Sequence, residues 1–141
     1  MSDEGGISLS RLPYDDSAWH VLLQTNNGEF SSALAFYVDK GTFKSFAKQL
    51  AEFPVGKEEE VRFEIGSRDG NWAYYLLLRA ITYDRSGHIA IQVEVDNRQE
   101  GHRHSQASFF ISCEAASVNQ LGRRISAWLE KSDEPLVWRA S

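Results

Sequence analysis

The chain has 141 residues, with 15 Lys and Arg against 20 Asp and Glu, which gives a formal net charge of −5 at pH 7. This length suits one domain with a sizeable core, and the longest apolar run, around Tyr74 to Leu78, is far short of the roughly 20 residues that a membrane helix needs. Because an acidic protein repels phosphate, the charge also argues against nucleic acid as a partner. We therefore expect a single α+β domain over residues 1–141, frayed over 1–6, with no nucleic-acid or membrane partner.

The acidic excess lies entirely in the first half of the chain. Residues 1–70 hold twelve acids and seven bases, whereas residues 71–141 hold eight of each. Long-range attraction would steer a basic partner to that half, although a moderate negative charge also simply keeps a protein soluble. The acids that we predict to face such a partner are Asp15, Asp16, Glu58, Glu59 and Glu60.

The single cysteine and the first residues favour a cytoplasmic protein. Cys113 has no second cysteine to pair with, and the opening MSDEGG lacks the basic and apolar regions of a secretory signal. We find no nucleotide-binding loop, zinc-ligand cluster or nucleophile motif, so we expect no cofactor and no catalysis.

Strand patterns dominate the start of the chain. Residues 7–12 alternate apolar and polar side chains and predict a short edge strand before Pro13. Residues 19–25 and 29–38 flank Asn26-Asn27-Gly28, a sequence that tolerates positive φ and closes hairpins. The two segments are therefore predicted to pair.

A helix is predicted next, because apolar residues recur with helical spacing. They are Phe43, Phe46, Ala47, Leu50 and Phe53. Asp39 or Thr42 is the expected N-cap, and Pro54 ends the helix.

A charged link then leads to a strand over 61–65 and to a long hairpin, residues 72–84 and 88–96, that turns at Arg85-Ser86-Gly87. The first hairpin strand is apolar on both faces and the second alternates, which indicates an antiparallel sheet. Another strand is predicted over 102–113.

A second helix is expected to follow. Ser117 and Gln120 have the spacing of a capping box, and an apolar stripe continues to Lys131. Residues 136–139 predict a final short strand. The expected fold is α+β, a single curved antiparallel sheet of about 6–8 strands with two helices on one face, in the order β-β-β-α-β-β-β-β-α-β.

This element order, with its apolar spacings, resembles the small bacterial immunity proteins of the WapI type over roughly residues 18–131. The similar segments are Trp19 to Leu23, Phe36, the helix with Phe43, Phe46 and Leu50, Val61 to Glu64, the long hairpin, and the helix with Leu121, Ile125, Trp128 and Leu129. The resemblance implies a cytoplasmic protein without catalysis that binds and blocks a toxin domain. It supplies no catalytic or binding residue.

Two groups of residues are candidates for chemistry. His102 and His104 would project to one face of a strand and could share a metal ion, with Asp96 or Glu100 as a third ligand, but a solvated hairpin tip is the commoner meaning, and we expect no metal site. Cys113 is about 30 Å along the strand from both histidines and forms no dyad with them.

The hairpin strand that is apolar on both faces is the strongest hint of an interface. The two helices cover one face only, so Tyr75 and Leu77 on the other face must be covered by a protein partner, by a second copy of the chain, or by the fold itself. Arg79 and Glu94 flank them.

From the sequence we therefore expect a protein-binding role, with a basic toxin domain as the partner. The alternative is a small enzyme or ligand-binding domain with a pocket between the sheet and the helices. Its polar groups would be Arg79, Glu94 and one of the histidines.

Overall fold

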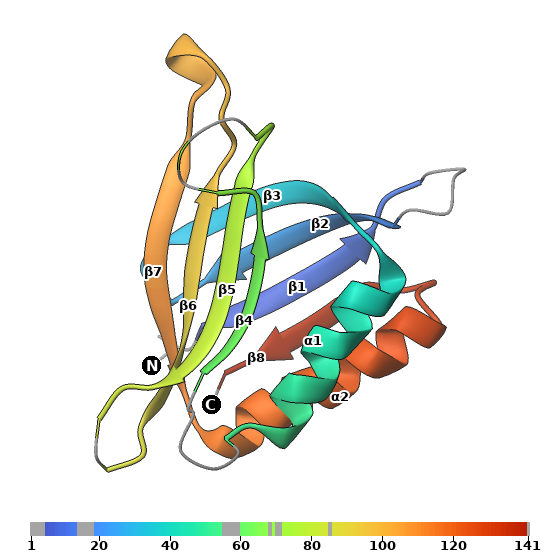
Figure 1. The fold of residues 1–141 in the computed structure, drawn as a ribbon, viewed down its shortest axis with the longest axis vertical. Coiled ribbons are helices and arrows are strands. Elements are labelled where there is room, and N and C mark those ends of the chain that lie inside the picture. Colours follow the sequence, from blue (N-terminus) through green and yellow to red (C-terminus); the bar gives the residue numbers. More distant parts are fainter. Residues whose placement is uncertain are drawn as a thin grey trace.

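The computed structural model describes residues 5–13, 19–54, 60–67, 69, 72–84 and 86–140. The strands in these ranges are β1 (Gly6–Arg11), β2 (Trp19–Asn26), β3 (Ser31–Val38), β4 (Glu60–Ile65), β5 (Tyr75–Thr82), β6 (Ile89–Asp96), β7 (Gln106–Cys113) and β8 (Leu136–Arg139). The helices are α1 (Lys40–Glu52), α2 (Ala115–Glu130) and the short 3-10 helix η1 (Gly101–Arg103). The predicted α+β class and the order of the main elements are confirmed (Figure 1).

The strands form two antiparallel sheets rather than the single sheet predicted. The first sheet has the strand order β3-β2-β1-β8 and the second has the order β4-β5-β6-β7. Figure 1 shows the strands of the two sheets crossing at a large angle. The chain changes sheet at each main helix, since α1 links β3 to β4 and α2 links β7 to β8. Sequence pattern over a few residues predicts hairpins well. It does not predict whether two strands joined by a helix belong to the same sheet or to different sheets.

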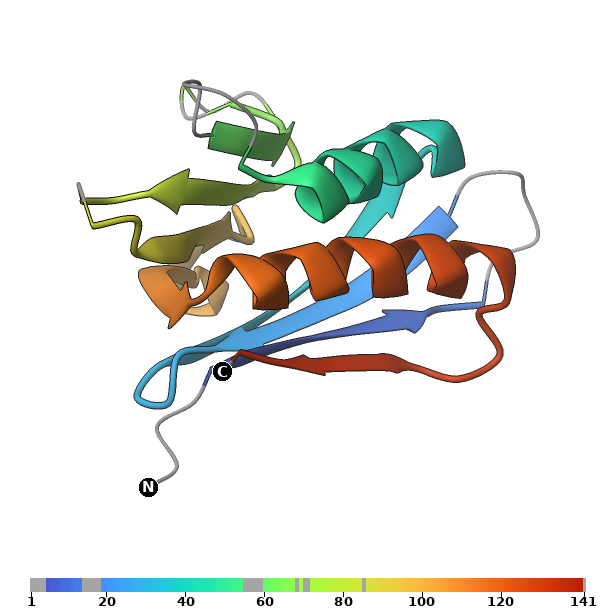
Figure 2. The ribbon, with the colours of Figure 1, turned by 90° about the horizontal axis from the view of Figure 1, so that it is seen from below.

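All covering elements lie on one side of the first sheet. Its inner face meets the second sheet at one end and the side-by-side helices α1 and α2 at the other (Figure 2). Within the described residues, the opposite face of the first sheet is therefore left open.

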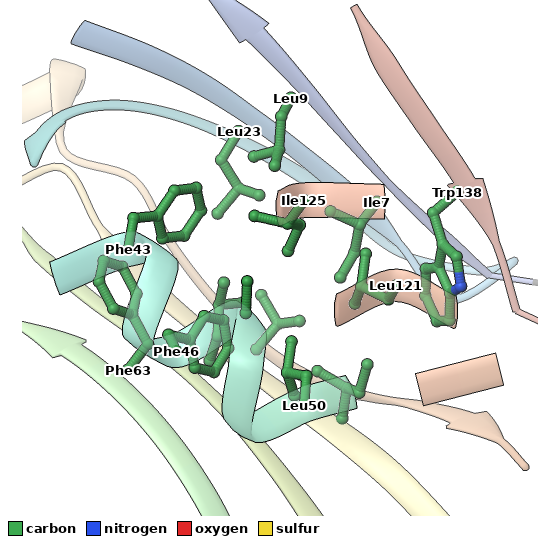
Figure 3. Packing of buried hydrophobic residues seen from close by; sticks show 14 of the residues in the cluster. Ile7, Leu9, Leu23, Phe43, Phe46, Leu50, Phe63, Leu121, Ile125 and Trp138 are labelled. Atoms are coloured by element: carbon green, nitrogen blue, oxygen red, sulfur yellow. The ribbon is translucent and has the colours of Figure 1, made fainter. Parts of the chain in front are cut away.

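Aromatic side chains fill the junction of the sheets and helices. Phe36 and Phe43 are fully buried, and the ring of Phe63 on β4 lies 5.1 Å from that of Phe43 and 5.2 Å from that of Phe46. Figure 3 shows these rings from α1 and β4 together. On the other side of the core, Trp138 of β8 donates its indole N–H to the Ser117 carbonyl at 3.0 Å, which joins the last strand to α2.

The N-cap of α1 was predicted correctly and that of α2 was not. Asp39 caps α1, where its Oδ2 accepts the Thr42 N–H at 2.9 Å. Helix α2 instead begins one turn before the expected capping box, after Glu114, which makes no side-chain cap. Ser117 lies inside the helix, because the buried side of α2 starts with Val118 and needs a preceding turn to orient it.

The N-terminal fraying expected over residues 1–6 does not reach its last two positions. Gly5 and Gly6 are buried, and the Gly5 carbonyl accepts the Ala140 N–H at 3.0 Å. Residues 1–4 are outside the described ranges. Among the helices that the structure describes, none is long and apolar enough to cross a membrane.

The two main helices approach each other closely at Gly122. A Cβ at this position would lie 2.4 Å from both the Ala47 carbonyl oxygen and the Ala51 nitrogen of α1. Such distances are well inside van der Waals contact, so the absence of a side chain sets the spacing of the pair. Asn119 adds two hydrogen bonds from its Nδ2, to the carbonyls of Leu50 at 3.0 Å and Phe53 at 2.6 Å.

We expect Gly122→Ala to lower the free energy of unfolding by about 2 kcal/mol or more, because the added methyl group meets backbone atoms that cannot move aside. An ordinary helical Gly→Ala change stabilises by about 1 kcal/mol, so the sign of the effect is diagnostic. The control is Gly41→Ala in α1, where the new Cβ would meet only Asp39 Oδ2 at 3.4 Å. Chemical denaturation measures both variants, and a stabilised Gly122→Ala protein would refute the close approach.

Candidate functional site

The outer face of the second sheet is charged, with ion pairs across β4 and β5 and a hollow of about 420 Å³ over β6 and β7 that is lined by Glu94, Asp96 and Gln106 among others. Arg79 donates to Glu60 Oε1 and to Gln92 Oε1, each at 2.8 Å, and Arg62 lies 3.6 Å from Glu60 and 3.8 Å from Glu64. Such long side chains cover the strands beneath them with their aliphatic stems.

Tyr75 and Leu77 lie under this layer. They are 2% and 1% exposed, and the Tyr75 hydroxyl donates to Glu64 Oε2 at 2.7 Å. The fold itself therefore covers both residues, and they do not offer the accessible contact area that an interface needs. Glu94 is half-buried in the same cross-strand row as Leu77.

Of the acids that we expected to face a partner, the structure describes Glu60 alone. Glu60 lies at the start of β4 and pairs with Arg79. Asp15, Asp16, Glu58 and Glu59 lie outside the described residues.

The histidines do not form the pair that the sequence allowed. His102 belongs to η1 and not to a strand, so it does not share a face with His104. His104 Nε2 lies 2.9 Å from Asp96 Oδ1. Burial acts to raise the pKa of Asp96, but the Arg98 N–H and His104 stabilise its carboxylate more, so its pKa is lowered. In the described ranges, no group of three or more His, Cys, Asp or Glu side chains could hold a metal ion.

Cys113 and the space beneath the helices are also unsuited to chemistry. Burial, with a smaller contribution from Glu114, raises the pKa of the Cys113 thiol to about 12, so the nucleophilic thiolate is scarce at neutral pH. Beneath the helices, a space of about 10 Å³ is lined by apolar side chains, and a hollow of about 540 Å³ between α1 and β4 is lined by Asp39, Arg62 and Glu64 among others. Neither holds the Arg79, Glu94 and histidine groups of the predicted pocket. Arg79 and Glu94 are on the far side of the second sheet.

The open outer face of the first sheet has a different character. Its strands contain no Asp or Glu, whereas the strands of the second sheet contain four. The side chains on this open face, which alternate with the buried ones, belong to Ser8, Ser10, His20, Leu22, Gln24, Asn26, Ser31, Ala33, Ala35, Tyr37, Val137 and Arg139. We call this surface the open face.

An aromatic pair lies at one end of the open face. The rings of His20 and Tyr37, opposite each other on β2 and β3, stack with centroids 4.1 Å apart and planes 8° apart. Tyr37 is 44% exposed, and its backbone N–H donates to the Tyr74 hydroxyl oxygen at 2.9 Å. Each ring thus covers one face of the other, and the stacked pair, which we call the platform, leaves its outer ring faces for a further planar group at the β3 edge of the sheet.

A groove lies at the other end of the open face. It encloses about 780 Å³, and Gly6 forms part of its floor, directly between Asn26 on β2 and Arg139 on β8 in the strand register. The residues that line it include no Asp or Glu. Ser8, Gln24 and Ser31 add further polar groups.

Sequence reasoning missed this face because most of its residues are small or polar and none of them belongs to a recognisable binding motif. The available signal was the absence of any acid from the four strands in a chain with 20 acids. Recognising it required knowing that β8, from the far end of the chain, pairs with β1.

Neither a protein-family model nor a curated protein sequence matches the chain. Among solved structures it is similar to WHY1 from Arabidopsis thaliana, with 12% identity, a TM-score of 0.51 and coverage of 92% of this chain and 85% of that one. For WHY3 from Arabidopsis thaliana the values are 12%, 0.52, 92% and 83%. For the plant transcriptional regulator PBF-2 they are 12%, 0.50, 89% and 75%. At this identity the similarity shows a common fold.

This comparison corrects our expectations about function. The fold is shared with a transcriptional regulator, so the expectation of a toxin-neutralising immunity protein is wrong, as is the exclusion of nucleic acid as a partner. The physical reason is that net charge was summed over the whole chain, whereas the first sheet has no acid in its strands.

Leu77→Ala tests whether the layer of charged side chains on the second sheet buries Leu77 as part of the core. We expect a loss of about 2–5 kcal/mol in the free energy of unfolding, the usual cost of truncating a buried leucine. The control is Phe110→Ala on the same face, since Phe110 is 47% exposed and its truncation should cost about 1 kcal/mol or less. Similar denaturation midpoints for the two variants would mean that Leu77 is not core.

Proposed function

We propose that the chain binds single-stranded nucleic acid on the open face, as a non-catalytic protein of the cytoplasm. The observation that carries the proposal is that a protein of net charge −5 has one uncovered sheet face whose strands hold no acid, with an aromatic platform at one end and a polar groove at the other.

The platform suits bases rather than phosphates. Bases stack on aromatic side chains with about 1–3 kcal/mol per base, and this stacking tolerates any sequence. Sheet surfaces that carry aromatic rings are a common way to hold splayed bases. Stacking does not depend on positive charge, so a protein with few cations on its binding face can still use it.

The dimensions and charge of the open face favour a single strand over a duplex. Outward side chains on one strand repeat every two residues, or roughly 6.8 Å, so His20 and Asn26 on β2 are about 20 Å apart, enough for a short run of nucleotides. Duplex binding draws mainly on phosphate contacts, and the strands of the first sheet offer only two arginines, Arg11 and Arg139.

The structural neighbours support the proposal without deciding it. A protein of similar fold is a transcriptional regulator, so this framework is compatible with work on nucleic acid. The cytoplasmic location rests on Cys113, a lone cysteine left as a free thiol, which suits a reducing compartment.

Tyr37→Ala should weaken binding of a fluorescein-labelled 15-nucleotide dT strand about tenfold, because it removes half of the platform. Fluorescence anisotropy measures the affinity, and a thermal melt confirms folding. The matched control is Phe110→Ala, another exposed aromatic on a strand but on the outer face of the second sheet; its affinity should be unchanged. No binding by the wild-type protein at low salt, or equal losses in both variants, would overturn the proposal.

The salt dependence of the same binding should be shallow. If one or two phosphates are neutralised, the slope of log affinity against log salt is about −0.7 to −1.4. A slope steeper than about −3 would point to a phosphate-dominated site elsewhere on the molecule.

A further inference from the structure

The groove end of the open face is defined by two donor groups on either side of a bare backbone. Gly6 of β1 is paired with Asn26 of β2 on one side and with Arg139 of β8 on the other. A Cβ on Gly6 would meet the Trp138 carbonyl oxygen at 2.7 Å, so the position stays free of a side chain. Adjacent strands are about 4.8 Å apart, so the backbones of β2 and β8 are about 10 Å apart, with the bare Gly6 backbone between them; we call this place the slot.

The Asn26 side chain is oriented by its own turn. Its Oδ1 accepts the Gly28 N–H at 3.0 Å, which uses the oxygen and leaves the NH₂ group as the free end. That Nδ2 lies 3.8 Å from the place where a Gly6 Cβ would be. Asn26 therefore presents donors to the slot.

Arg139 on the opposite side also presents donors only, because a guanidinium has no acceptor. The slot thus has donors on both flanks, and the groove lining holds no carboxylate to accept a hydrogen bond. Gln24, one row further along the sheet, both donates and accepts and so does not alter this preference.

The bases differ in how well they fit such a slot. Guanine presents two adjacent acceptors, N7 and O6, which arginine binds in a bidentate manner. On this same edge of the base, thymine presents the single acceptor O4, adenine presents N7 beside an amino group, and cytosine presents an amino group. In the row of Asn26, Gly6 and Arg139 these amino groups would meet donors rather than acceptors, whereas both guanine acceptors would meet donors.

We propose that this slot selects guanine, with Arg139 bonding to N7 and O6 and Asn26 closing the other side. The inference rests on the proposed binding of single-stranded nucleic acid at the open face. It adds that the face has two parts, a platform that tolerates any base and a slot that reads one.

Short strands of dT that carry one central substitution test the inference. A single dG should raise the affinity of the wild-type protein about tenfold over all-dT, whereas a single dA or dC should leave it equal or lower. Replacing the dG by 7-deazaguanine, which lacks the N7 acceptor, should remove most of the gain. Binding of all strands with equal affinity would overturn guanine selection while leaving the proposed function intact, and binding of none would overturn both.

Arg139→Lys separates a base contact from a phosphate contact. Lysine keeps the charge and loses the planar fork, so the preference for dG over dT should fall to less than about twofold while the affinity for all-dT changes little. An unchanged preference for dG, or an equal loss of affinity for every strand, would show that Arg139 binds phosphate instead.

Asn26→Asp is the second test variant, and Asn27→Asp is its matched control. An aspartate keeps an oxygen for the Gly28 N–H but replaces the donor by an acceptor, so the gain from dG should be lost. Asn27→Asp places the same charge in the same turn, where its Oδ1 serves the N–H groups of Glu29 and Phe30, and should keep the preference for dG. Equal preferences in the two variants would exclude a role for Asn26 in reading the base.

Discussion

The architecture depends on the tight three-way junction where α1, α2 and the inner faces of the two sheets meet. Gly122 lets the helices approach to backbone contact, and the Phe43 and Phe63 rings close the space between α1 and β4. Since every covering element among the described residues sits on the same side of the first sheet (Figure 2), the junction that builds the core leaves the open face without cover from this part of the chain. The candidate site is thus a consequence of how the core is closed.

The two sheets solve the problem of an outer face in opposite ways. The second sheet covers Tyr75 and Leu77 with ion-paired side chains such as Arg79 and Glu60. Each surface ion pair stabilises the fold only weakly, but the aliphatic stems of these side chains bury apolar area. The first sheet instead carries small and uncharged side chains at its centre, such as Ser8 and Ala33. A flat surface of that kind excludes neither water nor a planar ligand.

Local features of this fold could be predicted from the sequence and global ones could not. The hairpins and the Asp39 cap follow from spacing and turn chemistry within a few residues. The division into two sheets, the start of α2 before Ser117 and the placement of Tyr75 beneath Glu64 all depend on contacts between distant segments. The open face belongs to this second kind, because Arg139 joins Asn26 only after β8 pairs with β1.

A negative net charge is compatible with selective recognition of nucleic acid and even favours it. Non-specific binding comes almost wholly from phosphate contacts, and a chain with a charge of −5 weakens that contribution everywhere. Contacts that do not rely on positive charge, such as stacking on Tyr37, then make up a larger share of the affinity. Because hydrogen bonds in the grooves or on exposed base edges carry the sequence information, lowering the phosphate contribution raises the ratio of specific to non-specific binding. On this reasoning, the acids of the second sheet repel nucleic acid in general. The strands of the first sheet have no acids, so nucleic acid can approach the open face.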